Sequence, residues 1–126
     1  MNALMMAQRN YAAGSATLQT SRRAEYDVIA GVTYRLREKA QSQKNDYPAF
    51  VQALYDNRKL WNALVVDIAD PKNELPDELR ARILYLAEFT NKYSGDLLRK
   101  KKKSVLPLLE INMAILRGLK TEGPSK

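Results

Sequence analysis

The stretch YDNRKLWNAL, residues 55–64, contains the only tryptophan of the chain and places an asparagine on an otherwise apolar face. Residues three and four apart share one side of an α-helix, so Asn57 and Trp61 lie among apolar neighbours. A buried amide without a hydrogen-bond partner costs about 1–3 kcal/mol. Asn57 therefore needs a partner wherever the helix buries this face. The face comprises Phe50, Leu54, Asn57, Trp61, Leu64 and Ile68.

Helical periodicity continues outward from this stretch over most of the chain, and no sustained alternation typical of β-strands occurs. The connections between the periodic segments are short, which favours close packing of the helices. The sequence therefore predicts an all-α fold, a compact bundle of about four helices. The predicted helices span about residues 21–43, 46–69, 75–94 and 105–118.

Capping residues mark the predicted ends of these helices. Ser21 and Asp46 suit the N-termini of the first and second helices, and Pro76 suits the start of the third. The pair Ser94-Gly95 is a stop signal for the third helix, and Gly118 is placed at the C-terminus of the fourth. Most of the predicted boundaries therefore rest on capping chemistry as well as on periodicity.

We predict one helical domain over residues 1–120, followed by a tail at 121–126. Residues 1–20 carry weaker signals and form either a flexible segment or a short helix within Ala3–Ala13. The apolar run Ala3–Ala7 is too short for a signal peptide, and no window approaches the ~18 apolar residues of a membrane-spanning helix. We therefore expect a cytoplasmic protein without membrane insertion.

The chain has no histidine and no cysteine, which removes the commonest general base, thiol chemistry and zinc–thiolate sites. Its densest acidic stretch lacks the residue order of a calcium loop and is interrupted by prolines. Helix capping and the positive end of the helix dipole explain most of these acids. We therefore predict a protein that is not an enzyme, with no cofactor, no metal site and no small-molecule substrate. The acids are Asp67, Asp70, Glu74, Asp77 and Glu78.

Five consecutive cations account for most of the net charge of +7, and the rest of the chain carries only +2. Such a run can neutralise phosphates of RNA or DNA, or touch an anionic membrane. The simpler interpretation, which we favour, is a solvated connection between the third and fourth helices. No pattern of aromatic residues interleaves the charges, as single-strand binders usually require. The cations are Arg99, Lys100, Lys101, Lys102 and Lys103.

Asn57, Trp61 and Asn112 allow three interpretations. Both asparagines lie on apolar helical faces, where they either bond backbone or solvent at the edge of the core or fix the register of the helices. A third interpretation makes the turn from Asn57 to Trp61 part of a groove for a partner, because tryptophan contributes disproportionately to binding. We predict that Trp61 packs in the core and that Asn57 lies at its margin, making local hydrogen bonds.

Several of these motifs resemble the bacterial flagellar regulator family FlaF. The central segment DNRKLWNALVVDIADPKNELPDELRARI (56–83), followed by LAEF (86–89), is similar to the centre of the family. SRRAEY (21–26) resembles its helix opening, and LLEINMAILRGLK (108–120) resembles its closing segment. The resemblance covers residues 21–120, and the ordered combination of N-x-x-L-W, N-x-L-P and I-N-x-A-I-x-R-G-L is its most specific part.

The resemblance implies a small non-enzymatic protein that promotes flagellin synthesis and flagellum assembly. It also implies flagellin as a partner, held as an adaptor or secretion chaperone would hold it, with the regulator FlbT as a second partner. Asn57, Trp61 and Asn112 fall inside the matching motifs, which implies a structural role first and partner contact second. The alternative is a post-transcriptional regulator that contacts flagellin mRNA directly through Arg99–Lys103, or indirectly through FlbT.

Overall fold

Four helices make up the part of the chain described by the computed structural model, residues 15–121, with side chains placed for residues 23–118. This part contains no strand, which confirms the predicted all-α fold. The short helix predicted within Ala3–Ala13 lies outside the described residues. The helices are α2 (Ser15–Gln41), α3 (Tyr47–Ala69), α4 (Asp77–Leu98) and α5 (Leu106–Thr121).

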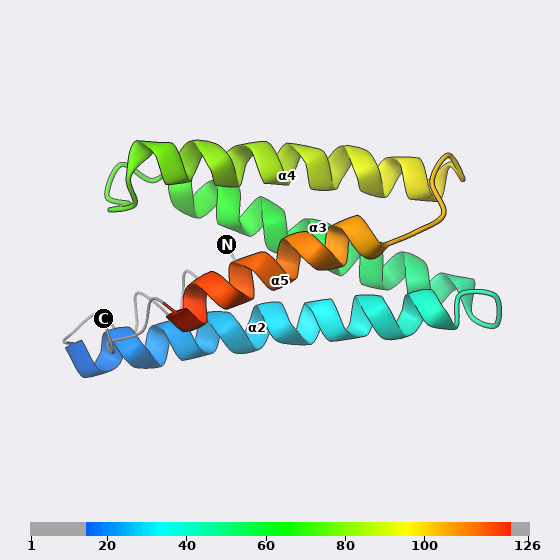
Figure 1. The fold of residues 1–126 in the computed structure, drawn as a ribbon, viewed down its shortest axis with the longest axis horizontal. Coiled ribbons are helices and arrows are strands. Elements are labelled where there is room, and N and C mark those ends of the chain that lie inside the picture. The colour runs from blue at the N-terminus through cyan, green and yellow to red at the C-terminus, as the bar shows by residue number, and fades with distance from the viewer. Residues whose placement is uncertain (1–14, 122–126) are drawn as a thin grey trace.

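The helices form an unequal bundle (Figure 1). Helix α2 packs along α3 and α5, whereas α4 packs along α3 and makes only a narrow contact with α5. The α2–α3 and α4–α5 connections lie at one end of the bundle, and the α3–α4 connection lies at the other (Figure 1). Helices α4 and α5 therefore each have one main neighbour, whereas α2 and α3 each have two.

The start of α3 follows the predicted capping chemistry. The Asp46 carboxylate accepts a hydrogen bond from the Ala49 backbone N–H at 3.2 Å, and Pro48 lies in the first turn, where its missing N–H costs nothing. The acids Asp77 and Glu78 occupy the first turn of α4, where they complement the helix dipole. Local capping signals therefore place the N-termini of both helices of this hairpin within two residues of their predicted positions.

Three predicted boundaries are wrong, and in each case the helix continues through the residue expected at its end. Ser21 lies inside α2, which begins at Ser15; Gly95 lies inside α4, and Gly118 lies inside α5. Gly95 is buried, and a Cβ built on it lies 3.2 Å from the Arg99 guanidinium. Burial of Leu97, two residues onward, stabilises the extra turn of α4 by more than the ~1 kcal/mol that a mid-helix glycine costs.

Helix α4 ends instead in a Schellman motif centred on Lys100. The Lys101 N–H donates to the Asp96 carbonyl at 2.8 Å, and the Lys100 N–H donates to the Leu97 carbonyl at 3.1 Å. Lys100 has a φ of 65°, in the left-handed region where glycine is usual. Its ammonium lies 4.4 Å above the centre of the Tyr47 ring, a cation–π contact with the start of α3.

The apolar core is divided into two clusters along the bundle. The larger cluster, near the α4–α5 connection, draws on all four helices. The smaller one draws its buried residues from α2 and α3, with α5 packed against it and no residue of α4. The larger cluster contains Leu36, Phe50, Ala53, Leu54, Leu97, Val105, Leu108 and Leu109; the smaller contains Ile29, Val32 and Leu60.

The left-handed conformation of Lys100 gives a first testable prediction. We expect Lys100→Gly to have a free energy of unfolding about 1 kcal/mol higher than Lys100→Ala, because glycine adopts this conformation without steric cost. Both variants lose the contact with Tyr47, so their difference reports on the backbone alone. Urea denaturation of the two proteins measures it.

The control is the same pair of substitutions at Lys92, an exposed position inside α4. There alanine should be the more stable variant by about 1 kcal/mol, as in any helix interior. If alanine were the more stable residue at position 100 as well as at position 92, the backbone of Lys100 would not be strained.

Candidate functional site

A buried polar cluster joins three helices near the middle of the bundle. The Asn112 amide of α5 is at its centre: its Oδ1 accepts from Trp61 Nε1 at 2.9 Å, and its Nδ2 donates to Asn57 Oδ1 at 2.7 Å. The same Nδ2 donates to Thr33 Oγ1 at 3.1 Å, and this hydroxyl donates to the Ile29 carbonyl at 2.7 Å. All of these side chains are buried, and Trp61 is only 1% exposed.

The direction of each hydrogen bond in the cluster follows from the indole of Trp61. Indole N–H is a donor only, so the oxygen of Asn112 must face Trp61. The two amide hydrogens of Asn112 are then directed to Asn57 and Thr33. Both the oxygen and the nitrogen of this amide are therefore hydrogen-bonded. The chain of donors and acceptors therefore has one arrangement, which fixes how α5 sits on α2 and α3.

Asn57, Trp61 and Asn112 are brought together as one unit, but Asn57 does not lie at the margin of the core as predicted. It is fully buried, and its partner is 55 residues away in the chain. The apolar stripe of one helix cannot reveal this, because the partner belongs to another helix. Thr33, on the apolar stripe of α2, is a member that the sequence reasoning missed. A polar residue on each of three apolar stripes was the available signal.

Among the side chains that the structure describes, three buried polar atoms have no hydrogen-bond partner: Asn57 Nδ2, Thr90 Oγ1 and Ser94 Oγ. Asn57 belongs to α3, and Thr90 and Ser94 lie one turn apart on α4. An unsatisfied buried polar group costs about 1–3 kcal/mol. The side chains of α4 buried beside them are also small, namely Ala87 and Gly95. The buried face of α4 therefore carries two hydroxyl oxygens without partners and only one large apolar side chain, Leu97.

The residues of the cationic run are all exposed, and hydrogen bonds fix the backbone on both sides of the run. The Schellman motif fixes one side of the connection, and the Tyr93 hydroxyl donates to the Ser104 carbonyl at 2.6 Å on the other. Burial raises the pKa of the Tyr93 phenol above its usual value, and the negative charge of Asp96 raises it further. The run is thus an exposed connection between α4 and α5 with defined backbone geometry.

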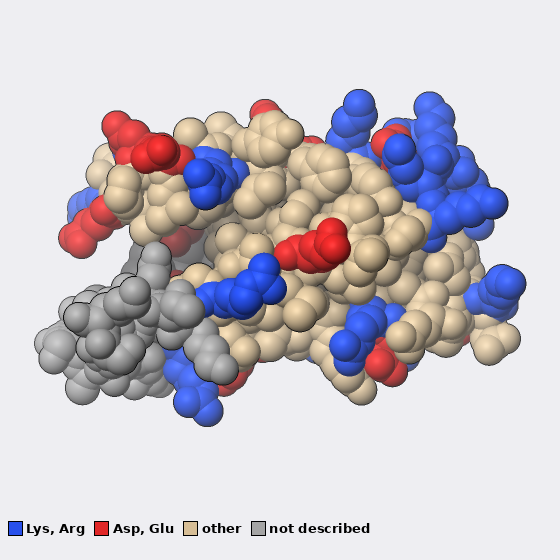
Figure 2. All heavy atoms as spheres, in the orientation of Figure 1, with Lys and Arg blue, Asp and Glu red and all other residues tan. Residues whose placement is uncertain are grey.

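The fold adds another cation that the sequence reasoning did not connect with this run. Lys44 lies in the α2–α3 turn, just before Tyr47, whose ring Lys100 covers. Figure 2 shows lysine and arginine side chains gathered at this end of the molecule. We call this surface, made of Lys44 and Arg99–Lys103, the basic end.

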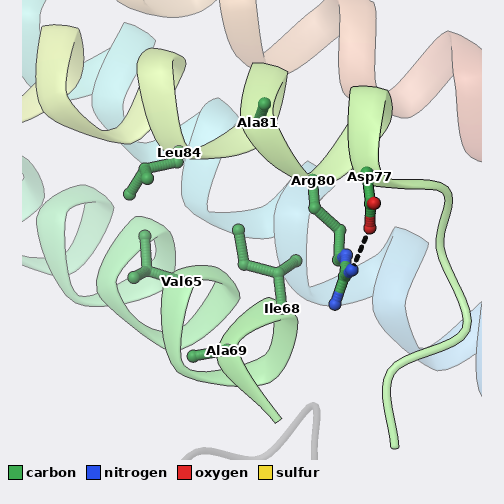
Figure 3. A pocket seen from close by; sticks show the side chains of 7 residues that line it. All are labelled: Val65, Ile68, Ala69, Asp77, Arg80, Ala81 and Leu84. Atoms are coloured by element: carbon green, nitrogen blue, oxygen red, sulfur yellow. Dashed lines mark hydrogen bonds and ion pairs between the residues drawn. The ribbon is translucent and has the colours of Figure 1, made fainter. Parts of the chain in front are cut away.

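The opposite end of the bundle contains an apolar groove between α3 and α4. No side chain in residues 62–86 is fully buried, although this segment is rich in aliphatic residues. The groove has a volume of about 290 Å³, and the side chains from the two helices point toward one another across it, with the Asp77–Arg80 ion pair at its edge (Figure 3). Leu84 is 44% exposed. The lining residues are Val65, Ile68, Ala69, Asp77, Arg80, Ala81 and Leu84.

The acidic stretch, residues 67–78, lies at the same end of the bundle (Figure 1). No group of three or more potential carboxylate, histidine or cysteine ligands comes together among the residues that the structure describes. Within the same residues, none of the helices is both apolar and long enough to cross a bilayer.

Comparison with known families shows the family of this chain. A family model described as flagellar protein FlaF matches residues 7–119. The chain belongs to the FlaF family. Comparison with curated proteins and with solved structures gives no significant match. The FlaF match contains the polar cluster, the groove and the basic end, so all three are features of a flagellar protein.

The geometry of the polar cluster gives a second prediction. We expect Asn112→Leu to lower the free energy of unfolding by about 3 kcal/mol, because Trp61 Nε1 and Asn57 Oδ1 both lose their partner. Asn57→Leu should cost only about 1 kcal/mol, because Asn112 keeps Thr33 as an acceptor and an unpaired Nδ2 disappears. Urea denaturation compares the two.

Asn62→Leu is the matched control, because Asn62 is an exposed asparagine on the same helix. Its effect should stay within about 0.5 kcal/mol, as for most surface substitutions. An Asn57 variant as unstable as the Asn112 variant would contradict the central place of Asn112.

Proposed function

We propose that this FlaF protein is a non-enzymatic adaptor or secretion chaperone that binds flagellin and so promotes its synthesis and export. The observation that carries the proposal is the groove between α3 and α4, where two helices leave aliphatic side chains uncovered. An amphipathic helix binds such a groove by laying its apolar face between the helices, with contacts spaced three and four residues apart. The helical termini of flagellin are ligands of this kind.

The size and shape of the groove favour a polypeptide over a small molecule. Pockets for small molecules usually measure about 300–1,000 Å³ and enclose most of their ligand. The groove is at the lower limit, and its lining residues Ala69, Ala81 and Leu84 are exposed to solvent. A partner helix inserting one or two apolar side chains would fill it. The lack of histidine and cysteine in the whole chain also supports a role in binding and not in catalysis.

The exposure of the N-terminal half of α4 supports the same function. Its N-terminal half has no fully buried side chain, and all of its buried residues lie between Ala87 and Leu97. A small displacement of this half would widen the groove without disturbing the polar cluster, to which α4 contributes no hydrogen bond.

FlbT is a candidate second partner at a different surface.

The third prediction tests this groove directly. We expect Leu84→Lys to reduce flagellin binding at least tenfold, because a partner helix would have to desolvate the new charge against apolar side chains. Met113→Lys is the matched control: Met113 is 50% exposed on α5 and does not line the groove. Both proteins should keep the melting temperature of the parent. Titration calorimetry with purified flagellin measures the affinity.

A second variant separates flagellin from RNA. Replacing Lys100, Lys101, Lys102 and Lys103 with glutamine should leave flagellin affinity unchanged and nearly independent of salt, as expected for an apolar contact. Direct regulation through mRNA would instead give a steep salt dependence that vanishes with the lysines, since each phosphate contact releases counterions. Retained flagellin affinity in Leu84→Lys would refute the groove, and binding of flagellin mRNA alone would refute the adaptor.

A further inference from the structure

The basic end concentrates cations on a surface with few compensating charges. Arg99 pairs with Asp96 at 2.9 Å, and the Asp46 carboxylate caps α3. No ion pair in the described part of the chain involves Lys44 or Lys101–Lys103. The charges of these lysines are therefore available to an anionic partner.

The aromatic rings of Tyr47 and Tyr93, which lie next to the basic end, each have one face already occupied. The Lys100 ammonium covers the Tyr47 ring, and the Tyr93 ring stacks on Phe89 with 5.5 Å between centroids. Proteins that hold single-stranded nucleic acid combine a basic surface with free aromatic faces. Lysine also predominates over arginine here, and arginine is the better residue for specific phosphate recognition. The chemistry favours a diffuse layer of negative charge over a defined nucleic-acid ligand.

An exposed leucine follows the cations closely in the chain. Leu106, the first residue of α5, is 55% exposed and follows Lys103 by three positions. Its backbone N–H donates to the Ser104 hydroxyl at 3.1 Å, which fixes this turn. Lysines flanking a solvent-exposed apolar side chain match the interface of an anionic bilayer, where cations meet headgroups and apolar groups reach the acyl boundary.

We propose that the basic end binds peripherally to the surface of an anionic membrane, with the lysines on the headgroup phosphates and Leu106 at the acyl boundary. Hydrogen bonds from the Lys100, Lys101 and Lys102 N–H groups to carbonyls of α4 hold these lysines at the end of the bundle. Each cation close to such a membrane raises the partition coefficient roughly fivefold, and the gain is screened by salt. This surface lies at the opposite end of the bundle from the groove, so a membrane-bound molecule would keep the groove accessible (Figure 1).

The experiment is co-sedimentation of the full chain with phosphatidylcholine vesicles, with and without phosphatidylglycerol, over a salt series. We expect binding only to the anionic vesicles, weakening as salt rises. The double variant Lys101→Gln, Lys102→Gln should lower the partition coefficient roughly thirtyfold. The matched variant Lys59→Gln, Lys72→Gln removes two exposed lysines outside the basic end and should bind almost as well as the parent.

Two further arms test the apolar contact and the source of phosphate. Leu106→Ala should lower binding to anionic vesicles roughly three- to tenfold, whereas Met113→Ala, which truncates an exposed apolar residue elsewhere on α5, should not. Soluble glycerol phosphate, at the phosphate concentration of the vesicles, should not displace the protein.

Three results would overturn the proposal: equal binding to neutral vesicles, equal losses in the two lysine pairs, or displacement by glycerol phosphate. Retention of RNA at a salt concentration where anionic vesicles do not bind would also overturn it and assign the basic end to nucleic acid. None of these results depends on whether the protein binds flagellin.

Discussion

The amide of Asn112 is the interaction on which the arrangement of three helices depends. One side chain accepts from the indole of α3 and donates to an asparagine of α3 and a threonine of α2. In each of these helices the polar residue lies between members of the two apolar clusters. Apolar packing tolerates small rotations and shifts between helices, whereas hydrogen bonds of defined direction do not. The cluster therefore supplies register where leucine contacts alone would leave alternatives.

Helix α4 stands outside this network, and its position explains the openness of the opposite end. Its buried face consists largely of small or hydroxyl-bearing residues, two of them with unpartnered oxygens, and it has a single extensive neighbour. The molecule thus combines three helices joined by the polar cluster with a fourth helix that contributes no hydrogen bond to it. Under the proposed function, the cluster would keep α3 in place while the N-terminal half of α4 accommodates a partner helix at the groove.

Periodicity and capping residues were sufficient to predict the four helices, and Asp46 and Pro48 predicted the start of α3 well. The same local signals failed at Ser21, Gly95 and Gly118, where the helix continues through the residue. At Gly95, burial of Leu97 outweighs the weak preference for ending a helix. Only part of the polar cluster could be predicted from the sequence. Sequence spacing identified Asn57 and Asn112 as unusual, but it contains no information on which residues of other helices meet them. The groove between α3 and α4 was not predicted, because it depends on how the two helices pack against each other. No local sequence pattern contains that information.

The single tryptophan of the chain, Trp61, is also a hydrogen-bond donor in the polar cluster. Its fluorescence therefore reports on one location, the junction of α2, α3 and α5, and not on an average over the molecule. Movement of α4 leaves the hydrogen bond of that indole untouched, whereas separation of α5 exposes it to water. The protein thus carries an intrinsic optical probe that distinguishes a partner accommodated at the groove from one that takes the bundle apart.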